Sequence, residues 1–244
     1  MDKVVSIFRI DVVVYPNQTI PLRIFEPRYR QMLDKCMSED RTFAISTVNP
    51  DKKVGGWDGP NNIGTLVYVT KCEDLDLTGT NYYIEILGKE RIEIIDLIKP
   101  QLDKPVIYNP PHNPSMQTML SEAGGGNLYF QARINKLPEI EGQTSPSQWK
   151  TIVTKLEERI NEAARRMGVS FNGFDEFIKH NELDIEGGSV MDLYNISSMC
   201  SLSVETQQAI LESSTVDQIY QLIQWANTFL SMSILLGSSH LVQT

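Results

Sequence analysis

The chain has 244 residues, of which 41% are hydrophobic, and its 22 basic and 31 acidic side chains give a formal net charge of −9. This length and apolar content suffice to bury one or two cores, so one or two domains are expected. The acidic balance argues against non-specific binding to nucleic acid or to anionic membranes, because both require clustered Lys and Arg. No uninterrupted apolar run reaches about 18 residues, so no membrane span is predicted. The first residues lack the apolar stretch of a signal peptide, and a cytoplasmic protein is expected.

The three cysteines are Cys36, Cys72 and Cys200. Their number is odd, they are far apart, and none belongs to a Cys-x-x-Cys pair. This pattern is typical of buried thiols in a reducing compartment and does not indicate a disulfide framework or a zinc site.

The first 109 residues are dominated by short runs rich in Val, Ile, Tyr and Phe. These runs predict β-strands at residues 4–10, 19–24, 42–48, 63–70, 81–88 and 91–98. One helix is predicted from Pro27 to about Met37, because its apolar residues recur at helical spacing. The last two strands are expected to form a hairpin in which Gly88 adopts a positive φ at the turn. Many short strands and one helix favour a small closed or half-closed barrel.

Residues 110–146 differ in composition, with several prolines followed by three consecutive glycines from Gly124 to Gly126. Such composition predicts a linker or insertion that could hold one short helix. The stretch GNLYFQA within it is similar to a viral-protease recognition site used to remove purification tags, and no function is assigned to it.

Residues 147–244 have helical patterns. Helices are predicted at residues 145–168, 189–201, 203–214 and 215–237, and Ser203 is expected to cap the third of them. The first carries an apolar stripe of Ile152, Leu156 and Ile160. The predicted architecture is therefore α+β, with a β-rich domain (1–109), a linker or insertion (110–146) and a helical domain (147–244).

The final turns of the last predicted helix are apolar almost all round. Its inner seam is predicted to consist of Ile219, Leu222, Ile223, Ala226 and Leu230. The larger side chains Trp225, Phe229 and Met232 lie on a neighbouring face. That face could belong to the core, to a homodimer interface or to a binding surface.

No catalytic or cofactor-binding pattern is present. The sequence contains no G-x-S-x-G elbow, no phosphate-binding loop and no dinucleotide fingerprint. Its three histidines are scattered and lack metal-ligand spacing. Two acidic stretches, at residues 73–76 and 182–186, lack the dense oxygen pattern of a calcium loop, and solvated loops explain them more simply. No catalytic residue, cofactor or metal is predicted.

The stretch IPLRIFEPRYRQML, at residues 20–33, concentrates prolines, arginines and aromatic residues. It is interpreted first as a strand-to-helix corner, because Pro27 fits the first helical position and Glu26 suits the positive end of the helix dipole. Phe25 and Tyr29 could pack across the turn into the helix. Arg28 or Arg30 could pair with a carboxylate on the barrel.

The same stretch resembles the opening motif of the Lon protease N-terminal domain family, the substrate-binding LON domain. Further matches are a Gly-Thr strand, a Gly-x-x-Arg hairpin motif and a Gln-x-x-Leu-Glu helix. The matching residues are Pro16, Pro21, Leu22, Ile24, Phe25, Glu26, Arg28, Tyr29, Arg30, Met32, Gly64, Thr65, Gly88, Arg91, Gln208, Ile210, Leu211 and Glu212. The resemblance covers most of residues 4–108 and 146–236.

This resemblance implies a PUA-like pseudo-barrel followed by a helical bundle. It also implies a non-catalytic module that binds unfolded or partner polypeptide segments in protein quality control, since the ATPase and Ser-Lys peptidase modules of full-length Lon are missing. An RNA-binding PUA-like module and a scaffold for one protein partner are the alternatives. The candidate binding residues are Phe25, Arg28, Tyr29, Trp225, Phe229 and Met232.

Overall fold

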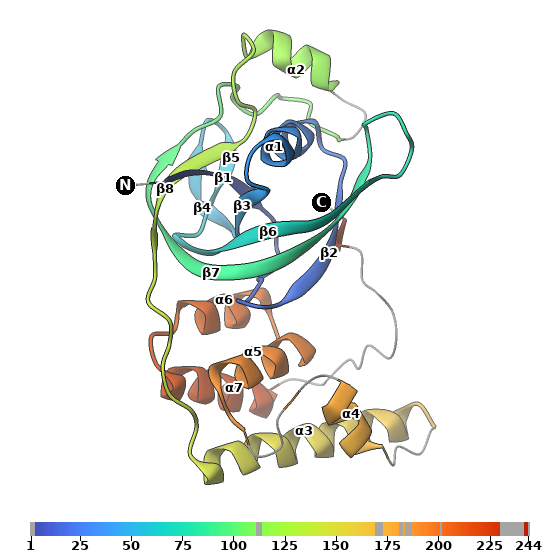
Figure 1. The fold of residues 1–244 in the computed structure, drawn as a ribbon, viewed down its shortest axis with the longest axis vertical. Coiled ribbons are helices and arrows are strands. Elements are labelled where there is room, and N and C mark those ends of the chain that lie inside the picture. Colours follow the sequence, from blue (N-terminus) through green and yellow to red (C-terminus); the bar gives the residue numbers. More distant parts are fainter. Residues whose placement is uncertain are drawn as a thin grey trace. The chain divides into compact units, whose positions relative to one another are not determined.

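The computed structural model describes residues 3–110, 114–168, 173–180, 183, 187–200, 202–229 and 242–243. The chain forms two compact units. The first contains Met1–Pro138 together with Ser239–Thr244, and the second contains Glu139–Ser238. Strands dominate the first unit and helices the second, which confirms the predicted α+β class (Figure 1). Within the described residues, no helix is both long and apolar enough to cross a membrane.

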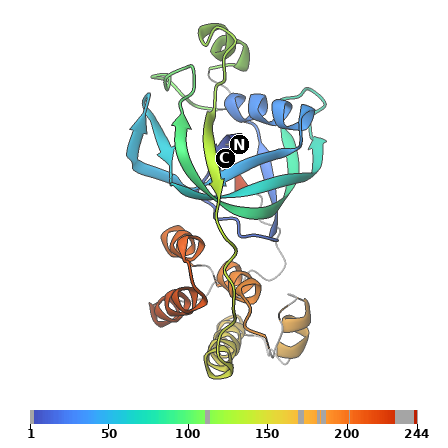
Figure 2. The same ribbon diagram turned by 60° about the vertical axis from the view of Figure 1, so that its left-hand side comes forward.

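The first unit is built on a sheet that closes on itself. Its strands have the order β6-β3-β1-β8-β7-β2-β9, and a further β6–β7 pairing closes a ring of β6, β3, β1, β8 and β7, so that the strands curve around a common interior (Figure 2). A separate two-stranded sheet pairs β4 with β5. The elements are β1 (Lys3–Arg9), β2 (Thr19–Ile24), α1 (Pro27–Ser38), β3 (Thr42–Ser46), β4 (Val48–Val54), β5 (Trp57–Pro60), β6 (Ile63–Asp74), β7 (Tyr82–Ile98), α2 (Met116–Glu122), β8 (Phe130–Lys136) and β9 (Val242–Gln243).

The hairpin predicted around Gly88 is wrong. β7 runs without a turn from Tyr82 to Ile98, pairing with β6 along most of its length and with β8 near its end. Gly88 has no positive φ. A Cβ atom at Gly88 would overlap the carbonyl oxygen of Tyr15, so the glycine is required for close approach of two backbone segments. Composition alone does not distinguish that use of glycine from a turn.

The segment expected as a linker or insertion supplies a strand to the first unit. β8 lies between β1 and β7, where Ala132 pairs with both Val5 and Leu97. Its alternate residues Phe130 and Ala132 are buried. A short helix, α2, precedes it, and Ser115 caps the start of this helix, because its hydroxyl accepts a hydrogen bond from the Thr118 N–H. The glycines and prolines around these elements conceal the alternation on which a strand prediction depends.

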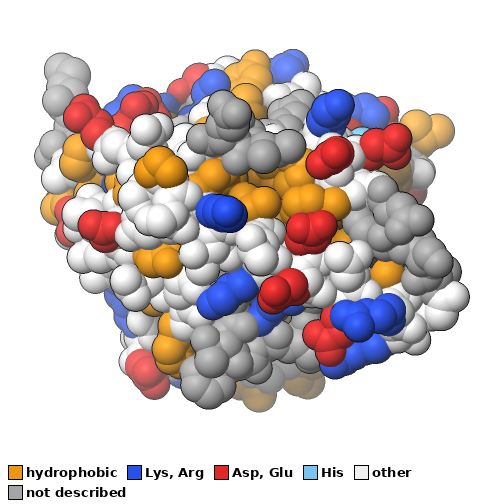
Figure 3. Space-filling model, turned by 90° about the horizontal axis from the view of Figure 1, so that it is seen from below, with side chains coloured by type: hydrophobic (Ala, Val, Ile, Leu, Met, Phe, Trp, Pro, Cys, Tyr) orange, Lys and Arg blue, Asp and Glu red, His pale blue; other side chains and the backbone are white. Residues whose placement is uncertain are grey.

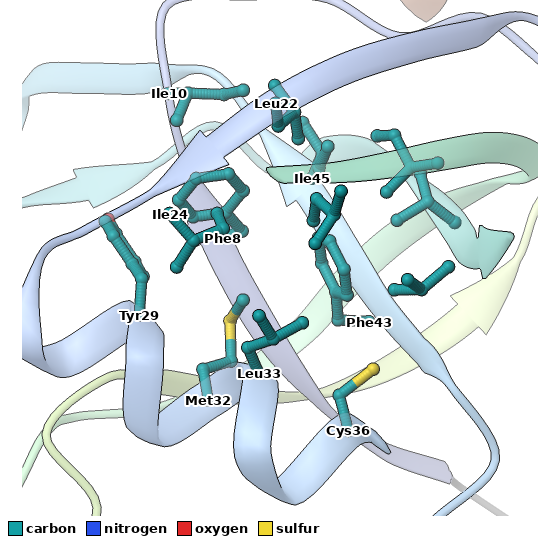
Figure 4. Packing of buried hydrophobic residues seen from close by; sticks show 14 of the residues in the cluster. Phe8, Ile10, Leu22, Ile24, Tyr29, Met32, Leu33, Cys36, Phe43 and Ile45 are labelled. Carbon is teal, nitrogen blue, oxygen red and sulfur yellow. The ribbon is translucent and has the colours of Figure 1, made fainter. Parts of the chain in front are cut away.

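One hydrophobic cluster of the first unit lies between α1 and the sheet, and a second one, without residues of α1, includes Trp57 and Phe130. Tyr29, Met32, Leu33 and Cys36 point from one face of α1 towards the strands (Figure 4). The ring of Phe8 packs edge-on against Tyr29, with 4.3 Å between the ring centres. The predicted helix and its apolar stripe are therefore confirmed.

The second unit contains five described helices: α3 (Pro146–Arg166), α4 (Phe174–His180), α5 (Val190–Met199), α6 (Val204–Glu212) and α7 (Val216–Phe229). Ser145, Ser189 and Ser203 each cap a helix by accepting a hydrogen bond from the backbone N–H three residues later. The cap predicted at Ser203 is confirmed. The short helix α4 has no counterpart among the predicted helices.

The predicted apolar seams are largely buried. Ile152, Leu156 and Ile160 line the inner face of α3. On α7, Ile219, Ile223 and Ala226 are buried, whereas Leu222 is half-buried. The predicted continuation of this helix to residue 237, including Leu230, lies outside the described residues.

Candidate functional site

The strand-to-helix corner before α1 contains a buried ion pair. The Arg28 Nε atom donates a hydrogen bond to Glu26 Oε2 at 2.7 Å, and the two side chains are only 11% and 9% exposed. Tyr108 donates its hydroxyl proton to the same carboxylate oxygen at 2.6 Å. The carboxylate therefore receives two donors away from bulk solvent, which a buried charge requires.

Aromatic rings surround the Arg28 guanidinium. Its central carbon lies 4.2 Å from the ring centre of Tyr29, 4.5 Å from that of Trp57 and 5.6 Å from that of Tyr108. Burial alone would lower the pKa of Arg28, but its interactions with Tyr29, Glu26 and Tyr108 outweigh burial and raise it. Arg28 is therefore always charged, and its charge is stabilised by the carboxylate and by the faces of the rings.

The corner joins three parts of the first unit. Arg28 and Tyr29 belong to α1, Trp57 to β5, and Tyr108 to the segment after β7. Trp57 donates its indole N–H to the Leu102 carbonyl at 3.0 Å. We conclude that this cluster holds the segment after β7 against α1 and β5.

The three corner residues predicted to bind a partner, Phe25, Arg28 and Tyr29, differ in how deeply they are buried. The Tyr29 side chain is 1% exposed, and its hydroxyl donates to the Arg9 carbonyl at 3.1 Å. Arg28 is also buried, whereas Phe25 is half-buried. Tyr29 and Arg28 can reach a partner only if the core opens, so the geometry gives them a role in holding the corner together.

A second buried arginine, Arg9, was not singled out by its sequence context. Its guanidinium carbon lies 4.6 Å from the Phe130 ring centre and 5.9 Å from that of Trp57. Burial lowers the pKa of Arg9. Arginine within an apolar strand is the signal that could have identified it, because charged residues in such runs are buried only where other groups stabilise them.

The second unit carries an open groove between α6 and α7. Its volume is about 510 Å³, and it is lined by Ala209, Glu212, Ser213, Asp217, Gln218, Gln221 and Leu222. Trp225 follows Leu222 by one helical turn on α7, so the two side chains share a face of the helix. The Trp225 side chain is 61% exposed.

Trp225 differs from the other two tryptophans of the chain, since Trp57 and Trp149 are 2% and 3% exposed. Within the described part of the second unit, the exposed large hydrophobic side chains are Trp225 and Met167. From below, hydrophobic side chains gather on the visible face among scattered acidic and basic ones (Figure 3). The Phe229 side chain and Met232, which were predicted to share the face of Trp225, lie outside what the structure describes.

The cysteines are free and poorly suited to nucleophilic chemistry. Burial raises the pKa of Cys36 to about 12 and that of Cys200 to about 11, and it also raises the pKa of Cys72. The thiolate form is therefore scarce at neutral pH. Across the described residues, no group of three or more His, Cys, Asp or Glu side chains is arranged to hold a metal ion.

Comparisons with known proteins agree with this architecture. The model of a family described as the ATP-dependent protease La (LON) substrate-binding domain matches residues 4–224. No ATPase or protease module is evident within the 244 residues. Protein cereblon from Danio rerio is 29% identical over 93 residues, which are 38% of this chain and 21% of cereblon. The match thus spans about a fifth of the length of that curated relative.

Solved structures show the same fold. The crystal structure of a Lon N-terminal domain protein from Xanthomonas campestris has a TM-score of 0.57 and 14% sequence identity, and covers 91% of this chain and 98% of its own. The N-terminal domain of a Lon protease from the Mycobacterium avium complex has a TM-score of 0.55 and 15% identity, with coverage of 93% and 100%. At these identities the likeness concerns the fold.

Proposed function

Because the chain belongs to the family of LON substrate-binding domains, we propose that it is a non-catalytic module that binds polypeptide segments in protein quality control. The segments would be unfolded stretches of substrates or extended parts of a partner protein. The observation that carries this proposal is the family match over residues 4–224, which assigns substrate recognition as the general role.

The α6–α7 groove is the surface that best fits this role. A polypeptide segment needs an open, partly apolar surface, and the groove combines half-buried Leu222 with the neighbouring exposed indole of Trp225. Tryptophan is enriched among residues that dominate binding energy, because it buries a large rigid surface with little loss of side-chain entropy. We therefore place Trp225 at the centre of the binding face.

The corner cluster has a supporting role in this proposal. Arg28 and Tyr29 stabilise the barrel, and half-buried Phe25 remains a candidate contact at its surface. A homodimer that uses the Trp225 face is the competing use of the same residues. The three free cysteines favour a reducing compartment such as the cytoplasm.

The test is a fluorescence anisotropy titration with a labelled, permanently unfolded model protein, such as one that has been reduced and carboxymethylated. A single-stranded RNA of matched length serves as the control, and both are measured at two salt concentrations. We expect micromolar binding of the unfolded protein that persists at the higher salt concentration, and no RNA binding by this acidic chain.

Two variants make the test specific. Trp225→Ala should weaken binding of the unfolded protein at least fivefold. Met167→Ala, which removes the other exposed large hydrophobic side chain in the described part of the second unit, should leave it unchanged. Absence of binding to the unfolded protein, or salt-sensitive binding to RNA alone, would contradict the proposal. Analytical ultracentrifugation of both variants measures whether the Trp225 face instead supports a homodimer.

A further inference from the structure

The α6–α7 groove is acidic as well as partly apolar. Glu212 and Asp217 both line it and both are exposed, while no Lys or Arg is among its lining residues. Building on the proposed function, we propose that the groove selects polypeptide segments in which a Lys or Arg adjoins a large apolar residue. Complementary charge and apolar contact would then act on neighbouring positions of the same segment.

Glu212 stands at an unfavourable end of its helix. It is the last residue of α6, where unpaired carbonyl groups give the helix terminus a partial negative charge. The Glu212 carboxylate accepts a hydrogen bond from the neutral Gln208 amide at 2.8 Å. No Lys or Arg forms an ion pair with Glu212 in the part of the chain that the structure describes. A cation from a ligand would therefore reduce the repulsion between the Glu212 carboxylate and the carbonyl groups at the end of α6.

Asp217 brings a second negative charge to the groove. It belongs to the first turn of α7, and its carboxylate accepts a hydrogen bond from the neutral Gln148 amide at 3.2 Å. The described residues provide no ion pair for Asp217 either. The groove thus carries two carboxylates with amide partners, and a basic side chain of a ligand could interact with both.

The apolar part of the ligand has its own surface. Leu222 lines the groove, and Trp225 lies one turn further along the same face of α7. Trp225 can pack against an aromatic or aliphatic side chain, and its ring face also attracts a Lys or Arg side chain. A segment with a basic residue next to an apolar one could therefore place its charge near the carboxylates of the groove and its apolar side chain on Leu222 and the neighbouring Trp225.

The negative charge also excludes competitors. Acidic peptides and nucleic acid would bring like charge to Glu212 and Asp217, and the net charge of −9 adds repulsion at longer range. The groove is therefore expected to discriminate among segments of equal hydrophobicity.

Three labelled peptides test this selection. Each contains the same central aromatic pair, flanked by two Lys, two Gln or two Glu residues, and anisotropy gives Kd at low and high salt. We expect the order Lys, Gln, Glu from tightest to weakest, with the Lys peptide about three- to tenfold tighter than the Gln peptide at low salt. The difference should largely disappear at high salt, because the charges are exposed.

Variants assign the selection to the groove. Glu212→Gln combined with Asp217→Asn keeps side-chain size, and should remove the preference for Lys while preserving affinity for the Gln peptide. Glu157→Gln removes a charge from the exposed face of α3, outside the groove, and should change neither value. A preference for Lys that survives in the double variant would overturn the inference.

The remaining outcomes separate this inference from the proposed function. Equal binding of the three peptides would overturn charge selection and leave polypeptide binding intact. Absence of binding to all three, together with absence of binding to the unfolded protein, would overturn both.

Discussion

Arg28 and Glu26 form an ion pair at 2.7 Å in a corner where both side chains are almost completely buried. Taking two charges out of water is costly, and the pair is tolerated because Tyr108 and the surrounding rings supply further interactions. The pair fixes the junction between β2 and α1, which positions the helix over the barrel core. Glu26, Arg28 and Tyr29 of this stretch thus have a structural role.

Removing one partner of this pair should strongly destabilise the first unit. Glu26→Ala leaves the Arg28 charge buried without its carboxylate, and we expect a loss of about 3–5 kcal/mol in the free energy of unfolding. Tyr108→Phe removes one hydrogen bond to a charged group and should cost about 1.5–3 kcal/mol. Urea denaturation monitored by circular dichroism measures both values. A loss below about 1 kcal/mol for Glu26→Ala would show that the corner does not depend on the pair.

Gly88 should not tolerate even one added methyl group. In Gly88→Ala the Cβ atom would overlap the Tyr15 carbonyl oxygen, so backbone must move, and we expect a loss of about 1–3 kcal/mol or more. Lys89→Ala, at the exposed neighbouring position of β7, is the matched control and should change stability by less than about 0.5 kcal/mol. Equal stability of Gly88→Ala and the wild type would contradict the close approach of these segments.

Local signals in the sequence predicted the helices well, because a cap and an apolar stripe act within a few residues. Ser203 and the stripe of α1 are examples. Pairings between distant segments have no such signal. The place of β8 between β1 and β7, and the approach of Tyr108 to Glu26, depend on register and on tertiary packing.

In the candidate site, too, local signals identified single residues, whereas their burial and their neighbours depend on the fold. Arg28, Tyr29 and Trp225 were identified as chemically distinctive, but only the fold separates two buried residues from an exposed one. The α6–α7 groove was not predicted, since it requires residues of two helices to lie side by side. Leu222 was assigned to a buried seam because helical spacing alone does not reveal that a neighbouring helix leaves it half-covered.

The three thiols should differ in reactivity. Burial holds the pKa of Cys36 near 12 and that of Cys200 near 11, and both side chains are buried. Cys72 is half-buried, so it should react first with a thiol reagent at pH 8, whereas Cys36 and Cys200 should react only after unfolding. Mass spectrometry after timed alkylation, with and without urea, measures the order. Rapid native modification of Cys36 would contradict the packing of α1.

Asp40 should make a pH-dependent contribution to stability. Hydrogen bonds from Lys3 and Thr42 hold the pKa of Asp40 at about 2, below its usual value. A lowered pKa in the folded state stabilises the protein above the unfolded pKa of about 3.9, and this stability is lost as pH falls towards 2. Because the Asp40 side chain is 54% exposed, solvent screening limits the contribution to less than about 1 kcal/mol.

The measurement is a series of urea denaturations of Asp40→Asn and wild type between pH 6 and pH 3. The variant should be less stable at pH 6, and the difference should shrink as the pH falls below 4. Asp51→Asn, at an exposed position of β4, is the control and should give a smaller difference. A stability difference between wild type and Asp40→Asn that grows as the pH falls would contradict this role of Asp40.

Tryptophan fluorescence tests the central claim most directly, because Trp225 is 61% exposed while Trp57 and Trp149 are buried. Emission that iodide can quench should therefore come mainly from Trp225. Adding the unfolded polypeptide should shift this emission to shorter wavelength and protect it from iodide, with the same Kd that anisotropy gives, and Trp225→Phe should lose the response. Polypeptide binding that leaves Trp225 emission and quenching unchanged would contradict the claim that the α6–α7 face recognises polypeptide segments.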